Sequence, residues 1–452
     1  MRRVLPALCV GAGALLFSGC DDPATPTRPA DAAASTSAGT ASRGGFEVWT
    51  VDQSNTSGVS YGGRILIHDG AMLMGDAAAS ATPQATLDLS GETSTLCRQS
   101  TGAFPVRPHM LLFNRAETHA VLSFVTSGHV VVFDAAARKP VSCIRTSAGA
   151  GGARQAHAAF PSPDDSYILV ANQNGKLLER IDTDYAANRF VLNSAATLNL
   201  ATCTTPNGLP CQSPALRPDN APICPIVDGT GDYGFTTLRG GGMFVVDARS
   251  TPMRIVAEYD RSVVGANGCG GAEAAGSMYI NSGGGTASHL HGFDVFRFPL
   301  TGYDPSHAPN LPAPQVLFSS DEHDRDGHGM VVSRDERYLW VFDRDANVAE
   351  VFDAATGAHT GTVALAGAVS DDPTPDLADI SPSGSRIFVT LRGPNPLTGD
   401  PHVATGSTPG IGIVQVQEGG RTGTLKAVVP ISNRDANGVE RADPHGIRIR
   451  RR

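Results

Sequence analysis

The sequence predicts an all-β protein folded as a single seven-bladed β-propeller, and three observations lead to this fold class. The chain of 452 residues is rich in glycine (51) and proline (31), and only 17% of its residues are charged, which favours short strands joined by turns. A unit of about four short strands recurs with a period of roughly 40 to 50 residues. The last residues repeat the opening of that unit, whereas the residues from Gly45 onward look like its later strands.

The repeated unit is clearest in three stretches, which begin at Arg107, Gln155 and Asp326. Each has an apolar strand, a polar turn, a second strand, a Gly or Asn turn, and a third strand that ends in Phe-Asp or Ile-Asp. Two weaker copies begin at Ala221 and Pro375. Strands joined by regularly spaced turns are the pattern of propeller blades.

The two ends of the chain are expected to complete one blade together. The final stretch DPHGIRIRRR repeats the opening of the unit, while GFEVWTVDQS and GGRILIHDG look like later strands without a first. Closing the ring in this way leaves no strand edge unpaired. The predicted propeller spans residues 45–450, with long insertions at 201–220 and 393–410. The seven predicted blades are residues 443–450 with 45–92, 107–146, 155–200, 221–262, 272–319, 326–366 and 376–432.

Two stretches resemble the YVTN-type propeller repeat, namely HGMVVSRDERYLWVFDRDANVAEVFDAATG from His328 and HAAFPSPDDSYILVANQNGKLLERID from His157. In that family a Pro-His-Gly-like opening, a Ser-Pro-Asp-Gly turn and a Tyr-Val-x-Asn strand recur in extracytoplasmic seven-bladed proteins, including relatives of the haem-d1 domain and of lactonases. The resemblance covers most of residues 45–450 and implies the architecture, whereas such propellers serve many functions. A fainter similarity is to propeller-type periplasmic metal chaperones and copper-dependent propeller oxidases.

The N-terminus predicts export and a lipid anchor. Residues 1–19 contain two arginines, an apolar stretch and small residues before Cys20, and LFSGCDD resembles the bacterial lipobox, in which this cysteine is acylated. A plain secretory signal with an incidental cysteine is the alternative. Residues 20–44 are rich in Pro, Ala, Ser and Thr and are expected to form a disordered tether. We therefore expect a lipid-anchored protein of the bacterial cell envelope, either periplasmic or exposed on the surface.

Six cysteines remain once Cys9 and Cys20 are set aside, and outside the cytoplasm cysteines pair. Two of the six lie on comparable late strands of neighbouring units, and two flank a short Pro/Gly loop. The expected disulfides are Cys97–Cys143, Cys203–Cys211 and Cys224–Cys269. A thiolate metal site at Cys224 or Cys269 is the alternative.

Alignment of the repeats places His109, His157, His328 and Asp376 at one equivalent position, with 48 residues from His109 to His157 and again from His328 to Asp376. His445 takes the same place in the final stretch. Because the innermost strand of each blade lines the channel, these five side chains are expected to form an arc around it. Neutral imidazoles with one carboxylate suit Zn or Cu(II), so the arc is a candidate metal site.

The two other ring positions are expected at Ile223 and near Glu273. Three acidic residues close to ring members in sequence are candidates to orient an imidazole: Asp326, Asp379 and Asp443. The alternative account of the arc is one structural histidine, hydrogen-bonded to backbone near the channel and multiplied by repetition.

A secondary metal site is expected where His289 and His291 share one face of a strand, with His323 as a third ligand. Five further histidines are expected on the surface, namely His68, His119, His129, His359 and His402.

Three classes of function follow. A membrane-tethered module that binds Zn or Cu, in metal handling or sensing, is favoured over catalysis. A metal-dependent lactonase-like hydrolase or oxidase is the second class, and it needs a pocket at the channel mouth, lined by Arg392, Arg239 and the 393–410 insertion. The third is a protein-interaction scaffold without metal. The sequence contains no H-E-x-x-H or C-x-x-C-H motif.

The charge pattern bears on partners. The net charge is -9, and the basic cluster at the C-terminus is too short for a nucleic-acid footprint, so nucleic acid is not an expected partner. The expected partners are the membrane, through the lipid anchor, and another protein. We expect the protein itself to be a monomer.

Overall fold

The structure is a computed structural model that describes residues 45–283, 292–320, 322, 325–397 and 404–452. The predicted signal peptide and tether lie outside the described residues, as do Cys20, His289, His291, His323 and His402. Within the described ranges, no helix is long and apolar enough to cross a membrane.

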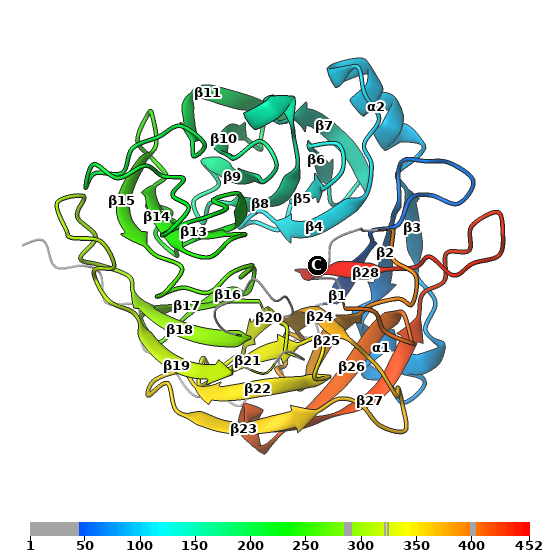
Figure 1. Ribbon diagram of the computed structural model, residues 1–452. Coiled ribbons are helices and arrows are strands. Elements are labelled where there is room, and N and C mark those ends of the chain that lie inside the picture. The colour runs from blue at the N-terminus through cyan, green and yellow to red at the C-terminus, as the bar shows by residue number, and fades with distance from the viewer. Residues whose placement is uncertain (1–44, 284–291, 321, 323–324, 398–403) are drawn as a thin grey trace, which may run out of the picture. The chain divides into compact units, whose positions relative to one another are not determined.

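Seven antiparallel sheets of four strands each form the blades of a propeller (Figure 1), which confirms the predicted fold class. The blade that joins the first and last described strands consists of β28 (Pro444–Arg451), β1 (Phe46–Asp52), β2 (Arg64–Asp69) and β3 (Ala85–Asp88). The next two consist of β4 (Pro108–Phe113), β5 (His119–Phe124), β6 (His129–Asp134) and β7 (Lys139–Arg145), and of β8 (Ala156–Pro161), β9 (Tyr167–Asn172), β10 (Leu177–Asp184) and β11 (Arg189–Asn199).

The remaining blades follow in chain order. The fourth and fifth consist of β12 (Pro222–Val227), β13 (Tyr233–Leu238), β14 (Met243–Asp247) and β15 (Arg254–Tyr259), and of β16 (Gly271–Ala274), β17 (Ser277–Asn281), β18 (Phe293–Pro299) and β19 (Gln315–Ser320). The sixth and seventh consist of β20 (Gly327–Val332), β21 (Tyr338–Asp343), β22 (Val348–Asp353) and β23 (His359–Ala364), and of β24 (Pro375–Ile380), β25 (Arg386–Leu391), β26 (Gly410–Gln417) and β27 (Thr422–Pro430). Short helices are α1 (Gly70–Met74), α2 (Glu92–Thr101), η1 (Ala78–Ser80), η2 (Ala150–Gly152) and η3 (Glu418–Gly420).

The second strand of each blade is buried at nearly every position, because each blade packs against a neighbour on both faces. The strand β21, YLWVFD, is buried at all six positions, and Trp340 from it joins Ile387 and Val389 of β25 in one hydrophobic cluster between two blades. Continuous apolar runs are the pattern of strands covered on both sides. The core therefore lies between the blades and holds them in the ring.

The turn that follows the first strand is built alike in several blades. The serine that opens it accepts a hydrogen bond from the backbone N–H five residues later, as Ser333 does from Tyr338 at 2.8 Å and Ser381 from Arg386 at 3.0 Å. The fourth residue of the turn has a left-handed backbone, with φ of 73° at Gly384. The turn needs a hydroxyl group at its first position and a residue that accepts positive φ at its fourth, which explains why this sequence pattern recurs.

The last strand pairs with the first, as the sequence predicts. In Figure 1 the red β28 lies beside the blue β1, and the antiparallel register runs from Phe46 opposite Arg451 to Asp52 opposite Pro444. The carboxylate of the buried Glu47 contacts Arg450 at 3.2 Å and Arg452 at 3.1 Å. The basic C-terminus therefore contributes ion pairs to ring closure.

The three disulfides match the expected pairing. Cys97 pairs with Cys143, which joins α2 to β7. The second bond, Cys203–Cys211, closes a loop of the insertion after β11, and the third, Cys224–Cys269, joins β12 to the segment before β16.

The expectation that His68, His119 and His129 lie on the surface is wrong, because these side chains are 1%, 7% and 0% exposed. All three lie on strands β2, β5 and β6, whose faces are covered by neighbouring blades. His129 is held between Ser127 and Thr101, at 2.8 Å from each hydroxyl. The side chain of His359 is 35% exposed, in line with the expectation.

Ring closure predicts that an acidic residue inside β28 destabilises the whole propeller. Ile447 lies opposite Thr50 and is 1% exposed, so Ile447→Asp places an unpaired charge in the core. We expect the free energy of unfolding to fall by about 3 kcal/mol or more in chemical denaturation. Arg451→Ser, on the same strand but with a largely exposed side chain, should change it by less than about 0.5 kcal/mol. Equal effects of both variants would contradict the closing role.

Histidine burial predicts that stability depends on pH. Burial lowers the pKa of His68 and of His129 from 6.5 to about 4, so between these values the unfolded chain binds more protons than the folded one. The free energy of unfolding should therefore fall as the pH drops through this window. In His68→Leu, the slope of that free energy against pH should be smaller by about 1.4 kcal/mol per pH unit, as measured by chemical denaturation.

A control separates titration from packing in this experiment. Val48 lies opposite His68 on the neighbouring strand, so Val48→Ala loses apolar contacts at the same place without removing a titrating group. This variant should keep the wild-type slope against pH. A wild-type slope in His68→Leu would show that His68 does not cause the pH dependence.

Candidate metal centre

A repeated bulge aims one side chain of each inner strand at the channel. In β4, β20 and β24 the register against the second strand shifts just after the first residue, between Pro108 and Leu111, Gly327 and Met330, and Pro375 and Ala378. Similar shifts occur in β8, β12 and β28. A bulge leaves residues outside the ladder and redirects their side chains, and this one falls on the second residue of each strand.

The second residues of the inner strands form the predicted ring. In the six strands with a bulge they are, in order, His109 (β4), His157 (β8), Ile223 (β12), His328 (β20), Asp376 (β24) and His445 (β28). In the remaining blade, where a ring member is expected near Glu273, β16 pairs with β17 without a bulge, and the Glu273 carboxylate accepts a hydrogen bond from Gly229 N. The five polar members are therefore consecutive around the ring.

Small and hydroxylated residues hold this ring together. The Ser123 hydroxyl accepts a hydrogen bond from Met110 N in its own blade and donates one to the carbonyl oxygen of His157 in the next, at 2.9 Å. Thr390 links Leu377 N to the carbonyl oxygen of His445 in the same way, at 2.7 Å. These hydroxyls were not foreseen, although each follows the ring member of its own blade by 14 residues.

A glycine after two of the ring histidines lets neighbouring inner strands approach closely. A Cβ atom at Gly329 would lie 2.2 Å from the carbonyl oxygen of Asp376, and one at Gly446 would lie 2.6 Å from that of His109. Both are shorter than any real Cβ contact, so a side chain at either place would push two inner strands apart. The His-Gly pairs in the repeat thus serve packing beside the channel.

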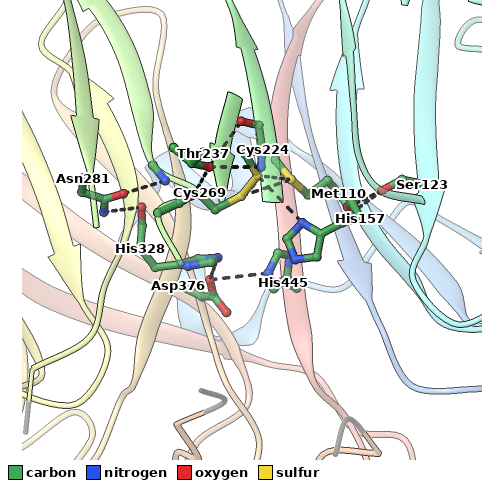
Figure 2. The surroundings of a disulfide bond; sticks show 12 residues. Met110, Ser123, His157, Cys224, Thr237, Cys269, Asn281, His328, Asp376 and His445 are labelled. Carbon is green, nitrogen blue, oxygen red and sulfur yellow. Dashed lines mark hydrogen bonds and ion pairs between the residues drawn. A yellow bond between two sulfur atoms is a disulfide. The ribbon is translucent and has the colours of Figure 1, made fainter. Parts of the chain in front are cut away.

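The donor atoms of three ring side chains lie close enough together to share one metal ion. His328 Nε2 lies 3.2 Å from Asp376 Oδ1, and His445 Nε2 lies 3.7 Å from the same oxygen. Figure 2 shows these side chains turned toward one another in the channel. The ring of His109 stacks on that of His445 with centroids 3.8 Å apart, and its centroid is 4.6 Å from that of His157. The arc therefore runs without a break from His328 to His157.

Several donor atoms of this cluster are buried without a hydrogen-bond partner among the described residues. They are both ring nitrogens of His328, Nδ1 of His445, Nε2 of His109 and Oδ1 of Asp376. Asp376 Oδ1 is near two imidazoles, but not in hydrogen-bonding geometry. Leaving a polar atom buried and unpaired costs about 1–3 kcal/mol, so a cluster of such atoms is a candidate binding site.

The imidazoles are neutral at pH 7. Burial lowers the pKa of His109, His328 and His445 well below the ordinary 6.5, and their mutual repulsion and nearby guanidinium groups lower it further. Burial also raises the pKa of the Asp376 carboxyl group, against the attraction of Arg392 and Arg344. Neutral imidazole is the form that presents a lone pair to a metal ion.

A buried chain of polar groups fixes the orientation of Asp376 and His109. Arg392 Nη1 donates to Asp376 Oδ2 at 2.8 Å, and its other donors bind Asp443 at 2.6 and 2.9 Å. Gln53 Nε2 donates to Asp443 at 2.7 Å, and Gln53 Oε1 lies 2.8 Å from His109 Nδ1. The amide oxygen only accepts, so His109 carries its proton on Nδ1, and its buried Nε2 keeps a lone pair.

Five residues make contacts that differ from the expectations for them. Arg392 is 1% exposed and does not line a channel mouth, and Arg239 is paired with Asp219. Asp443 orients an imidazole only through Gln53. Two of the three acidic candidates do not orient an imidazole at all, because Asp326 pairs with Arg344 and Asp379 accepts from the backbone N–H of Ile449 and Ile380. Burial raises the pKa of Asp326 to about 7, against the effect of Arg344.

His157, the fifth ring member, has different neighbours. Its Nδ1 lies 3.9 Å from the sulfur of Cys224, and with Cys269 these residues form a second group of close potential ligands. The cysteines are joined as a disulfide, so the alternative of a thiolate site does not hold for the oxidised protein.

Comparisons with known proteins show the fold of this chain. No family model and no curated protein matches the sequence. Solved structures do match. A protein from Lactobacillus plantarum is 11% identical with a TM-score of 0.56, and the periplasmic gluconolactonase of Pseudomonas aeruginosa is 14% identical with a TM-score of 0.54. A putative 6-phosphogluconolactonase from Bacteroides uniformis is 13% identical with a TM-score of 0.53. Each match covers 89% of this chain and 99% of the other, and at such identities the likeness extends to the propeller fold alone.

Proposed function

We propose that this propeller binds a divalent transition metal ion, Zn or Cu(II), in its central channel and acts in metal handling or sensing. His328, Asp376 and His445 are the proposed ligands, and His109 is the proposed fourth. The observation that carries the proposal is that one donor atom each of His328, Asp376 and His445 lies within 4.8 Å of the others, and that His328 Nε2 and Asp376 Oδ1 are buried without a hydrogen-bond partner among the described residues.

The spacing of the donor atoms fits an ion. Two ligands of a tetrahedral Zn ion, each at about 2.0–2.1 Å, lie about 3.3 Å apart. The separations of 3.2 and 3.7 Å from Asp376 Oδ1 to the two imidazoles are close to this value. One carboxylate with neutral imidazoles is a ligand set that suits Zn and Cu(II).

The compartment in the proposal is the bacterial cell envelope. Three disulfides in one chain favour an oxidising environment, since cytosolic thiols are kept reduced. The predicted acylation of Cys20 would tether the propeller to a membrane by way of residues 20–44. Together these features support a role in metal traffic outside the cytoplasm.

Burial favours binding over catalysis. The four proposed ligands are between 0% and 7% exposed, whereas a metal hydrolase or oxidase needs an open coordination position that substrate reaches. The stretch GVSYG from Gly58 has the spacing of a nucleophile motif, but it lies in the connection between β1 and β2 rather than between a strand and a helix. Among the described residues, the channel side chains are therefore better suited to holding an ion than to catalysis.

Removal of two ligands tests the proposal. Protein purified without metal-affinity tags should bind about one Zn per chain in calorimetry and elemental analysis. The double variant His328→Ala/His445→Ala should lose at least about a hundredfold in affinity. His359→Ala, which removes an imidazole from an outer strand, is the matched control and should bind as the wild type does. Absence of metal binding in all three proteins would leave the interaction scaffold as the function.

A second variant tests whether His109 belongs to the site. Gln53→Leu removes the acceptor that holds the Nδ1 proton of His109 without touching a ligand. We expect a 10- to 100-fold loss of Zn affinity, roughly the effect of losing an outer partner of a metal ligand. Gln84→Leu, which breaks a hydrogen bond to Glu47 away from the channel, should leave affinity unchanged. Wild-type affinity in Gln53→Leu would remove His109 from the ligand set.

A further inference from the structure

The third disulfide, Cys224–Cys269, lies in the channel, unlike the other two. Cys224 belongs to the inner strand β12, and Cys269 stands directly before the inner strand β16. The bond Cys97–Cys143 instead joins a helix to the outermost strand of its blade, and the first cysteine of the remaining pair follows the outermost strand β11. A disulfide in the channel can lie next to side chains from other blades, which a disulfide at the outer edge of a blade does not reach.

Two further donor atoms lie against this disulfide. Met110 Sδ is 3.8 Å from the sulfur atoms of both Cys224 and Cys269. His157 Nδ1 is 3.9 Å from the sulfur of Cys224, and Figure 2 shows all four side chains meeting in the channel. Met110 and both cysteines are at most 3% exposed, whereas His157 is half-buried, so the cluster meets solvent at the imidazole.

The segments that carry the two cysteines are held together without the disulfide. Thr237 Oγ1 accepts a hydrogen bond from Cys224 N and contacts the carbonyl oxygen of Gly268, the residue before Cys269. On the other side of Cys269, Asn281 Oδ1 accepts from Gly270 N at 2.8 Å. Because these contacts flank both sulfur atoms, reduction of the bond leaves the sulfurs close together.

We infer that this disulfide is a redox switch for a second metal site, specific for Cu(I), in which Cys224, Cys269, Met110 and His157 are the ligands. Two thiolates, a thioether and an imidazole form a soft set, which selects Cu(I). The cluster of His328, Asp376 and His445 is made of nitrogen and oxygen donors and suits harder ions. The inference does not depend on the proposed function, because the two sites share no ligand.

The switching step is a thiol–disulfide exchange with a dithiol reductant. One thiolate of the reductant attacks a sulfur of the disulfide, and its second thiol resolves the mixed disulfide. The reductant leaves as its own disulfide, and its two electrons and two protons remain as the thiols of Cys224 and Cys269. Cu(I) then displaces both thiol protons to solvent and keeps its oxidation state.

The experiment compares Cu(I) binding by oxidised and reduced protein. The protein is treated anaerobically with a dithiol, desalted, and titrated with Cu(I) against a chromogenic chelator. We expect the reduced form to bind about one Cu(I) more than the oxidised form through these ligands, and that ion should protect Cys224 and Cys269 from alkylation, as read by peptide mass spectrometry. Zn binding by the oxidised protein, measured in parallel, reports separately on the proposed function.

Matched variants assign the site. Cys224→Ser/Cys269→Ser should lose the additional Cu(I), while Cys97→Ser/Cys143→Ser, which removes a peripheral disulfide, should keep it. Met110→Leu preserves volume and should weaken Cu(I) binding by about tenfold or more, so the test does not rest on cysteine variants that fail to fold.

Three outcomes would overturn the inference. The first is a Cys224–Cys269 bond that the dithiol leaves intact in the folded protein. The second is Cu(I) that gives these cysteines no protection from alkylation. The third is unchanged affinity in Met110→Leu.

Discussion

The pairing of β28 with β1 is the constraint on which the channel depends. It joins the two ends of the described chain into one sheet and thereby closes the ring of seven blades. It also brings His445 and Asp443, from the last ten residues, beside Asp376 and Gln53. A ring has no free end at which strain relaxes, so closure fixes the spacing of the inner strands and of the side chains that their bulges direct inward.

Closure also forces charged groups into an environment that excludes water. Arg392 binds one oxygen of Asp376 and both oxygens of Asp443, so one guanidinium group stabilises two buried carboxyl groups. Such networks seldom add stability over a well-packed apolar core, and removing one member leaves an unpaired buried charge. Its effect here is orientation, because Arg392 occupies Oδ2 of Asp376 and leaves Oδ1 directed toward His328 and His445.

The repeat register predicted the arc, because equivalent positions of inner strands face one axis. His109, His157, His328, Asp376 and His445 were therefore placed together from their spacing alone. Their partners were not predictable in this way. Arg392 follows Asp376 by 16 residues, as Arg344 follows His328, but this spacing does not say which carboxyl groups the guanidinium binds. The role of Gln53 depends on a contact across the closed ring, to Asp443.

The burial of His68, His119 and His129 was missed for a different reason. In a one-sided sheet, an apolar run interrupted by histidine indicates a solvent-exposed position. Blades packed on both faces have no such position on their middle strands, so polar side chains there are buried and take partners from the next element, as His119 does from Asn188. The pairing of Cys97 with Cys143 was predicted correctly on a wrong premise, because Cys97 lies in the helix α2 and not in a strand comparable to β7.

The two candidate ligand clusters divide the channel by the chemistry of their donor atoms. Nitrogen and oxygen donors extend from His328 through Asp376 and His445 to His109, and sulfur donors begin next to His157. In the oxidised protein the sulfurs are bonded to each other, so only the nitrogen and oxygen donors have lone pairs suited to a divalent cation. Among divalent ions, the affinity of a site with nitrogen and oxygen donors is highest for Cu(II), so affinity alone does not select Zn. A set of sulfur donors that becomes available only on reduction would separate Cu(I) from Zn by oxidation state rather than by strength of binding. If both proposed metal sites exist, this separation of Cu(I) from Zn follows from the position of Cys224–Cys269 inside the ring of blades rather than at its outer edge.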